Sequence, residues 1–142
     1  MNSRSISTAL RRGGAAAALM LTLVGGPAAH AQSNSTLATR DSADLGTFLT
    51  DTRGMTLYLY TKDDVGISNC YQGCAAAWPP LMAQSDPVLT ADLPGAIGTT
   101  TRTDGGLQVT YNGMPLYYWA KDQTPGDTTG QNVGGVWFVI NP

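Results

Sequence analysis

Beyond residue 45 the chain is dominated by short runs in which hydrophobic and polar residues alternate with the period of a β-strand. Leu107, Val109 and Tyr111 alternate with polar residues, and the pair Asn112-Gly113 follows them directly. Asn-Gly supplies the positive φ angles of a two-residue hairpin turn. The segment therefore predicts a hairpin whose second strand continues through Leu116–Trp119.

Other strand segments carry hydrophobic residues on both faces. A turn at Arg53-Gly54 separates a strand at Phe48–Asp51 from one at Thr56–Tyr60, where positions 57 and 59 face one way and 58 and 60 the other. Two apolar faces are typical of a strand buried between layers. Trp137–Ile140 has the same character, and Thr99–Thr101 suits an edge strand.

The chain repeats itself at an offset of 59 residues. Gly54–Asp63 recurs as Gly113–Asp122, with Gly, Met, Leu, Tyr, Lys and Asp at equivalent positions. At the same offset Trp78 corresponds to Trp137. Self-similarity at a fixed period indicates two related structural units.

These units span about residues 36–82 and 97–142, and a linker loop at 83–96 containing Asp-Pro and Leu-Pro-Gly joins them. Abundant threonine and the absence of glutamate favour strands over helices. One short helical turn is expected near Cys70–Trp78, where Pro79-Pro80 ends it. The predicted fold is a small, mostly β, antiparallel domain built from two pseudo-symmetric hairpin repeats.

The first 31 residues have the features of an export signal. Arg4, Arg11 and Arg12 form a positive region, residues 15–24 form an apolar stretch too short to span a bilayer, and an Ala-x-Ala site ends at Ala31. Cleavage between Ala31 and Gln32 leaves residues 32–142 as a single domain in the periplasm or the extracellular space. No transmembrane segment is expected, and no cysteine follows the apolar stretch to carry a lipid anchor.

The composition of residues 32–142 excludes several functional classes. It holds five basic and ten acidic groups, a net charge of −5, and every acid is aspartate. This charge argues against nucleic-acid binding. Without a histidine there is no imidazole base and no His-ligated zinc, and the serines lie in no hydrolase motif. The sequence therefore predicts a protein that is not an enzyme.

With the repeat laid out, the chain resembles a family of bacterial secreted proteins and predicted lipoproteins of unknown function. That family carries a repeated Y-x-[FWY]-x-x-D motif, often followed by C-x3-C and W-P-P. The motif residues here are Tyr58, Tyr60 and Asp63 in the first copy and Tyr117, Trp119 and Asp122 in the second. The resemblance implies an extracytoplasmic β-repeat domain and no established activity.

Cys70 and Cys74 are the only cysteines, and an exported chain meets oxidising conditions. Paired, they would close a five-residue loop and staple a small domain. The alternative is a redox pair or a soft-metal site, but the C-x3-C spacing differs from the C-x-x-C that lowers a thiol pKa. We expect a structural disulfide.

Four aspartates follow the ends of equivalent strands: Asp63, Asp64, Asp122 and Asp127. Brought together by pseudo-symmetry, they could offer oxygen ligands to calcium or form an Asp–Asp acid–base pair. The competing interpretation is that each aspartate caps its own turn by accepting backbone N–H groups. The recurrence at both positions favours turn capping.

The motif aromatics, Tyr58, Tyr60, Tyr117 and Trp119, are expected to point the same way from equivalent strands. Such a strip could stack a flat ligand such as a sugar or a quinone. Symmetric placement in two units favours a packed core instead.

Two further residue pairs recur. Lys62 and Lys121 precede the motif aspartates, and a solvated lysine lying over a neighbouring aromatic ring is expected rather than a nucleophile. Met55 and Met114 could contact copper(I), but with no histidine or further methionine nearby, packing is the better interpretation.

The leading functional hypothesis is an exported, non-enzymatic module with a structural or binding role, its partner an envelope protein or a small ligand. No cofactor is predicted. The alternative is an envelope metal-binding or redox-linked protein that uses the aspartate loops, with calcium or copper, or the cysteine pair.

Overall fold

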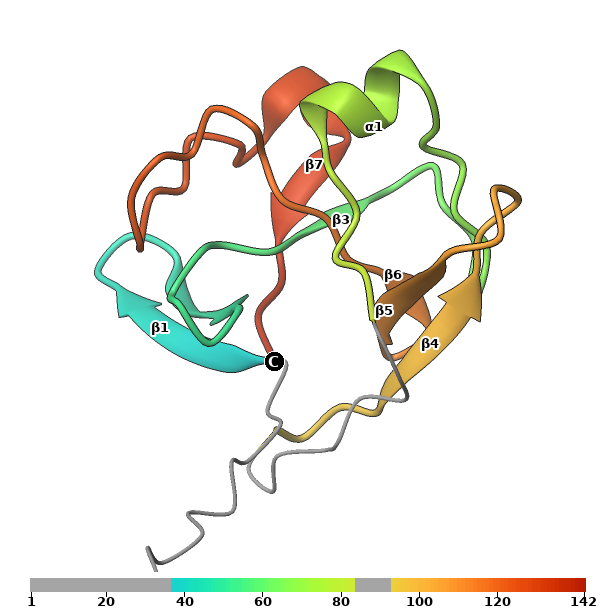
Figure 1. Cartoon of the computed structure of the whole chain (residues 1–142). Helices are drawn as coiled ribbons and strands as arrows, with labels where there is room; N and C mark the ends of the chain where they lie inside the picture. The colour runs from blue at the N-terminus through green and yellow to red at the C-terminus, as the bar shows by residue number, and fades with distance from the viewer. Residues whose placement is uncertain (1–36, 84–92) are drawn as a thin grey trace, which may run out of the picture. The chain divides into compact units, whose positions relative to one another are not determined.

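The computed structural model describes residues 37–83 and 93–142 (Figure 1). The predicted export signal at 1–31 and most of the predicted linker lie outside the described residues. Within the described ranges no helix is long and apolar enough to cross a membrane.

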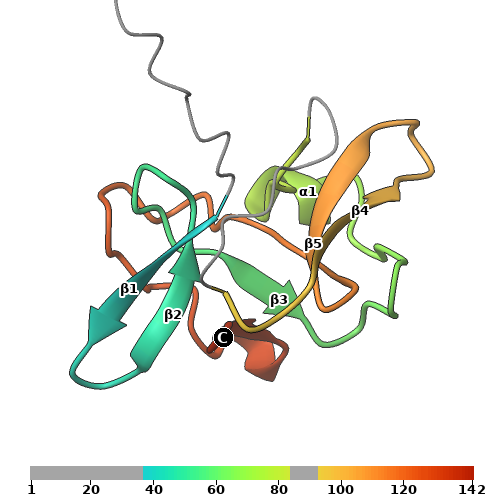
Figure 2. The same cartoon turned by 90° about the horizontal axis from the view of Figure 1, so that it is seen from below.

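The described residues form three small antiparallel sheets, so the predicted mostly β fold is confirmed. The first pairs β1 with β2, the second pairs β3 with β7, and the third has the order β4-β5-β6. The strands are β1 (Ala38–Ser42), β2 (Gly46–Thr50), β3 (Tyr58–Tyr60), β4 (Ile97–Thr101), β5 (Leu107–Tyr111), β6 (Met114–Pro115) and β7 (Trp137–Val139). Both views place β3 between the β1–β2 hairpin and β4–β5 (Figures 1 and 2).

The hairpin predicted around Asn112-Gly113 is present. Asn112 and Gly113 have φ angles of 51° and 81°, and Tyr111 pairs with Met114 across the turn. Two consecutive positive φ angles are what the local sequence favours. The predicted threonine strand is β4, which lies at the edge of its sheet.

The predicted continuation of that hairpin through Leu116–Trp119 is wrong. The strand β6 ends at Pro115, and the hairpin continues only as far as Leu116, whose N–H donates to the Val109 carbonyl at 3.0 Å. Beyond it, Tyr117 forms single bridges with Tyr58 and with Pro80. The chain leaves its own hairpin at this point to pair with the other repeat.

The sheet formed by β3 and β7 joins the two repeats. Tyr58 pairs with Val139 and Tyr60 pairs with Trp137. The sequence predicted both strands but not this pairing, and it predicted no strand at β1. A pairing between segments so distant along the chain leaves no trace in a local pattern.

The two faces of the central strands are buried in two separate core clusters. One face packs with Leu37, Leu49, Leu57, Leu81, Val109, Tyr111, Leu116 and Ile140. The other packs with Phe48, Tyr58, Cys70, Trp78, Tyr117, Trp137 and Val139. The alternation of positions 57 and 58 between clusters explains why both faces of the segment are apolar.

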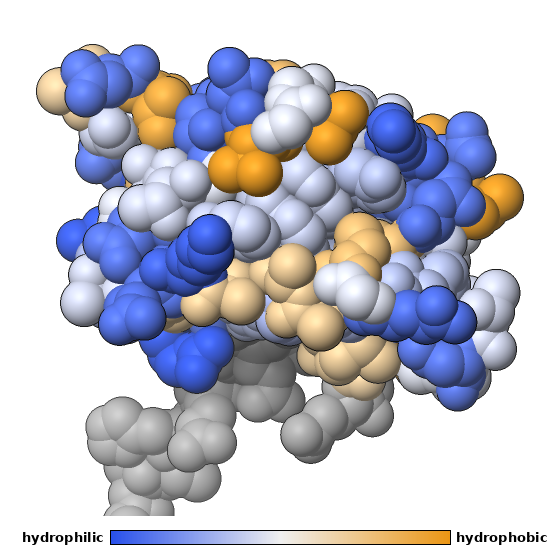
Figure 3. All heavy atoms as spheres, turned by 90° about the horizontal axis from the view of Figure 1, so that it is seen from above, coloured by the Kyte–Doolittle hydropathy of each residue, from blue (hydrophilic) through white to orange (hydrophobic). Residues whose placement is uncertain are grey.

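A helical turn precedes each of the equivalent tryptophans. The helix α1 (Gly73–Ala77) leads into Trp78, as predicted, and the 3₁₀ turn η1 (Val133–Gly135) leads into Trp137. The sequence did not reveal η1, whose glycines disfavour a helix; Gly134 has a φ angle of 60°. Seen from above, separate hydrophobic residues are scattered over a surface that is otherwise hydrophilic or of intermediate hydropathy (Figure 3).

Candidate functional site

The two motif tyrosines meet at the centre of the domain. The Tyr58 N–H donates to the Tyr117 carbonyl at 2.8 Å, and the Tyr117 N–H donates to the Tyr58 carbonyl at 3.0 Å. Neither tyrosine has any exposed surface. This reciprocal pair marks the pseudo-twofold relation between the repeats.

Each tyrosine then donates its hydroxyl to the aspartate of the other repeat. The Tyr58 hydroxyl lies 2.6 Å from Asp122 Oδ2, and the Tyr117 hydroxyl lies 2.6 Å from Asp63 Oδ2. Both aspartates are buried, at 8% and 7% exposure. The motif residues therefore interlock: the tyrosine of one copy binds the aspartate of the other copy.

The second oxygen of each aspartate is also used. Asp63 Oδ1 accepts the Asn69 N–H at 2.7 Å. Asp122 Oδ1 accepts the Thr129 N–H at 3.0 Å and the Thr129 hydroxyl at 2.6 Å. Each aspartate thus also holds the loop that follows it, which is the turn-capping role that the sequence favoured.

These contacts change how the groups titrate. Burial raises the pKa of Tyr58 and of Tyr117 far above the ordinary value, and the hydrogen bond to each carboxylate raises it further. Burial also raises the pKa of Asp63, although the hydrogen bond from Tyr117 acts in the opposite direction. Both phenols therefore stay protonated, and able to donate, above the pH at which an ordinary tyrosine ionises.

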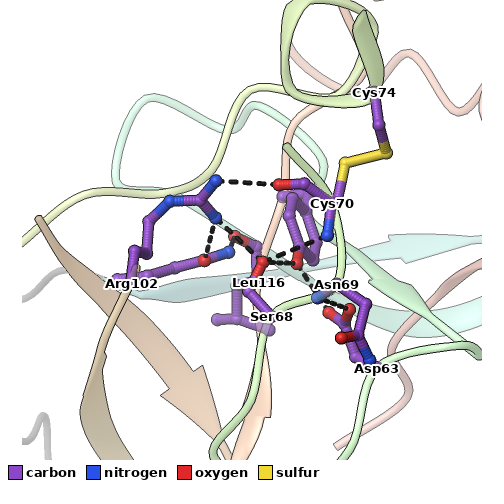
Figure 4. The surroundings of a disulfide bond; sticks show 9 residues. Asp63, Ser68, Asn69, Cys70, Cys74, Arg102 and Leu116 are labelled. Atoms are coloured by element: carbon purple, nitrogen blue, oxygen red, sulfur yellow. Dashed lines mark hydrogen bonds between the residues drawn. A yellow bond between two sulfur atoms is a disulfide. The ribbon is translucent and has the colours of Figure 1, made fainter. Parts of the chain in front are cut away.

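A buried arginine supports one side of this interlock (Figure 4). Arg102 is 3% exposed, and its guanidinium donates to Ser68 Oγ at 2.9 Å and to the Cys70 carbonyl at 2.8 Å. Ser68 Oγ lies 2.7 Å from the Tyr117 hydroxyl, and because Tyr117 donates to Asp63, Ser68 is the donor between them. A chain of hydrogen bonds therefore runs from a buried cation to a buried carboxylate.

Cys70 and Cys74 form a disulfide with a Cα–Cα distance of 5.2 Å (Figure 4). The bond closes the loop that leads into α1, and the carbonyl of Cys70 is the one that Arg102 holds. The disulfide therefore ties α1 to the segment anchored by the second repeat.

Four aromatic rings from both repeats stack face to face. Trp119 lies over Trp78 with ring centroids 4.0 Å apart, Trp78 over Trp137 at 3.9 Å, and Trp137 over Tyr60 at 4.2 Å. The interplanar angles are 26°, 5° and 15°. We call these four rings the aromatic column.

The motif tyrosines flank the column symmetrically. Tyr58 meets Trp78 edge to face at 5.4 Å, and Tyr117 meets Trp137 in the same manner at 5.2 Å. Gly130 lies close against one of these contacts, because a Cβ there would come within 2.8 Å of Tyr58 and 2.9 Å of Trp78. Of the predicted aromatic strip, Tyr60 and Trp119 are the outer rings of the column, and Tyr58 and Tyr117 contact its inner rings by their edges.

The remaining candidates are not brought together. Asp64 is exposed, and Asp127 accepts from the N–H groups of Gln123 and Thr124 within its own loop. Lys62 and Lys121 are exposed, and Lys121 Nζ lies 5.5 Å from the Trp119 ring centroid. Among residues 37–83 and 93–142, no three His, Cys, Asp or Glu side chains are grouped to hold a metal ion.

A family model described as a secreted repeat of unknown function matches the chain twice, at residues 39–82 and 98–141. The chain belongs to this family. Neither a curated protein nor a solved structure matches it. In this member of the secreted-repeat family, the tyrosine and aspartate of each motif copy bind those of the other copy. In this chain the two copies of the repeat therefore complete each other's hydrogen bonding.

Two features of the site lie beyond what the motif indicates. Arg102 precedes a polar hairpin turn, where an exposed side chain is expected. Asp51 is buried and accepts hydrogen bonds from Arg53 and from the Tyr118 hydroxyl. Burial acts to raise the pKa of Asp51, but hydrogen bonds from Arg53, Met55 and Tyr118 outweigh it and the pKa is lowered.

Proposed function

We propose that the chain is a non-enzymatic module with a structural or binding role in the cell envelope or the extracellular space. The observation that carries this proposal is the reciprocal bonding of Tyr58 to Asp122 and of Tyr117 to Asp63. The polar groups of the family motif are used to hold the repeats together. A pre-assembled scaffold is the role that such an arrangement serves best.

The chemistry of the aspartates supports the same role. An acid–base pair of carboxylates acts on a substrate that reaches at least one oxygen of each group. Both oxygens of Asp63 and of Asp122 accept hydrogen bonds from protein groups, and both residues are buried. A substrate would have to displace a tyrosine from the centre of the domain to reach them.

The proposed location follows from the family, which is described as secreted. The disulfide between Cys70 and Cys74 suits the oxidising conditions of the periplasm and the extracellular space. We propose no resident cofactor, and an envelope protein or a small ligand remains the proposed partner.

The test combines native mass spectrometry of the exported protein with activity assays. We expect a native mass equal to that of the oxidised polypeptide, with nothing lost on denaturation. We also expect no turnover on panels of hydrolase and oxidoreductase substrates. Turnover that Asp63→Asn abolishes while the variant keeps its circular dichroism spectrum would refute the proposal. The exposed Asp64→Asn is the matched control, since it changes the same charge next to the interlock.

A further inference from the structure

The scaffold role leaves one feature unexplained: the aromatic column is stacked more closely than a core requires. Aromatic pairs in protein cores commonly have centroids roughly 4.5–7 Å apart and favour edge-to-face or offset geometry. Here three successive contacts have centroids 3.9–4.2 Å apart, all in the stacked arrangement. The π-systems of four rings therefore overlap in one continuous path through both repeats.

The two inner rings of the column are buried, and its two outer rings are partly exposed. Trp78 and Trp137, the two inner rings, are each 4% exposed, whereas Trp119 and Tyr60 are half-buried. Indole and phenol are the side-chain rings that lose an electron most readily, and transfer between them is fast at ring contact. The column thus joins two partly accessible rings through two indoles that are almost completely buried.

Each inner indole also touches a tyrosine that has a base for its proton. Tyr58 contacts Trp78 and donates to Asp122, and Tyr117 contacts Trp137 and donates to Asp63. Oxidation of a phenol is favourable when the proton can leave with the electron, because the product is then a neutral radical. Both tyrosines have such a proton acceptor, because each phenol oxygen lies 2.6 Å from a carboxylate oxygen.

We propose that the aromatic column relays single electrons from Tyr58 and Tyr117 to outer-sphere one-electron oxidants at the surface of the domain. In the step at Tyr58, one electron passes through Trp78 and the column to the oxidant, which is reduced by one unit. The hydroxyl proton moves to Asp122, leaving a neutral tyrosyl radical beside a protonated carboxyl group. The return of one electron from a reductant drives the proton back, so no atom is gained or lost.

The two ends of the column differ in charge. Lys121 Nζ lies over the Trp119 ring at 5.5 Å, while no cation of the described residues lies over Tyr60. A cation over a ring makes loss of an electron from that ring less favourable. The electron therefore leaves preferentially at the Tyr60 end.

Flash photolysis with tris(bipyridine)ruthenium(III), generated in solution from the ruthenium(II) complex and a quencher, tests the relay on the full exported domain. We expect a tryptophan radical that converts to a tyrosyl radical, identified by electron paramagnetic resonance after ring-deuterated tyrosine is incorporated. The conversion should be slower in deuterium oxide, because a proton moves with the electron. A tyrosyl signal without a preceding tryptophan radical, or a conversion with no isotope effect, would overturn the proposal.

Variants locate the radical. Loss of most of the long-lived tyrosyl signal is expected in the Tyr58→Phe/Tyr117→Phe double variant. Tyr118→Phe is the matched control, because Tyr118 also donates to a carboxylate, that of Asp51, but has no ring contact with the column. A signal that survives the double variant and disappears in Tyr118→Phe would overturn the assignment.

A substitution at an exposed residue provides a second test in case the Tyr58→Phe/Tyr117→Phe variant fails to fold. Lys121→Gln removes the cation over Trp119 and should increase the initial rate of tryptophan radical formation several-fold. Lys62→Gln removes the equivalent exposed charge in the other repeat and should change the rate less. Equal rates in wild type and Lys121→Gln would contradict the proposed polarity of the column.

Discussion

The hydroxyl of Tyr58 in the first repeat donates to the carboxylate of Asp122 in the second, across 64 positions of the chain, at 2.6 Å. Its counterpart joins Tyr117 to Asp63 at the same distance. Each bond links the central strand region of one repeat to the capped loop of the other. Neither repeat can complete its own polar core, so the two fold as one unit.

Removal of one hydroxyl should be costly. Tyr58→Phe leaves Asp122 buried with only Thr129 as partner, and a hydrogen bond to a charged group contributes about 1.5–3 kcal/mol. We expect the free energy of unfolding in urea to fall by about this amount. Tyr71→Phe is the control, since the Tyr71 hydroxyl accepts from the N–H of the exposed Thr103 at 3.1 Å and donates to no buried aspartate. An equal loss in both variants would contradict the interlock.

On acidification, the contributions of Asp63 and Asp51 to the free energy of unfolding should change in opposite directions. Burial, the largest cause, raises the pKa of Asp63 above its ordinary value of 3.8, so the folded state binds the proton more tightly. Asp63 therefore contributes stability below pH 3.8 that is lost as the pH rises through its raised pKa. The pKa of Asp51 is lowered because its hydrogen bonds outweigh burial, so Asp51 contributes stability above pH 3.8 that is lost on acidification.

The measurement is the unfolding free energy of wild type minus that of Asp63→Asn, and likewise for Asp51→Asn, across the acid range. The first difference should become less favourable to wild type with rising pH, and the second more favourable. If both differences changed in the same direction with pH, the direction of one of the two pKa shifts would be wrong.

The hairpin turn and the two-faced strands could be predicted because they depend on neighbouring residues. Asn112-Gly113 needs only its own φ angles, and positions 57 to 60 need only alternate between two cores. The offset of 59 residues identified Tyr58, Asp63 and their counterparts as equivalent. It did not indicate that the tyrosine of one copy binds the aspartate of the other.

The reason is that an aspartate after a strand has an adequate local role. Asp63 and Asp122 do cap their own loops, and that role uses only one oxygen of each. The second oxygen reaches a tyrosine that the bridge between Tyr58 and Tyr117 brings near. The sequence does not predict that Arg102 is buried either, because its acceptors Cys70 and Gln108 come from both repeats.

The disulfide should stabilise the domain through the unfolded state. Closing a five-residue loop is worth about 2 kcal/mol on the chain-entropy estimate. We expect the Cys70→Ala/Cys74→Ala variant, measured by urea unfolding, to lose about this much and to remain folded. Wild type in a thiol reductant should shift equally, and the variant should not respond to the reductant. If the reductant also destabilised the variant, its effect on wild type would not come from breaking the disulfide.

Arg102→Lys should be harmful although it keeps the charge. The guanidinium reaches Ser68, Gln108 and the Cys70 carbonyl at once and lies 4.3 Å from the Tyr71 ring centroid. Lysine has no planar fork to satisfy these acceptors together. We expect a loss of about 2–4 kcal/mol in urea unfolding, because buried acceptors lose their donors. Arg53→Lys, at an exposed arginine with one carboxylate partner, is the control and should lose less than about 1 kcal/mol.

Calcium and copper should leave the melting temperature of the domain unchanged. A ligand that binds only the folded state raises stability in proportion to the logarithm of its concentration over its dissociation constant. A cation at Asp63 and Asp122 would have to replace hydrogen bonds that already occupy both oxygens of each carboxylate. The check is a thermal melt of wild type with each ion in turn, alongside Asp64→Asn/Asp127→Asn. A rise in the wild-type melting temperature that this variant abolishes would place a cation at the outer aspartates and support the metal-binding alternative.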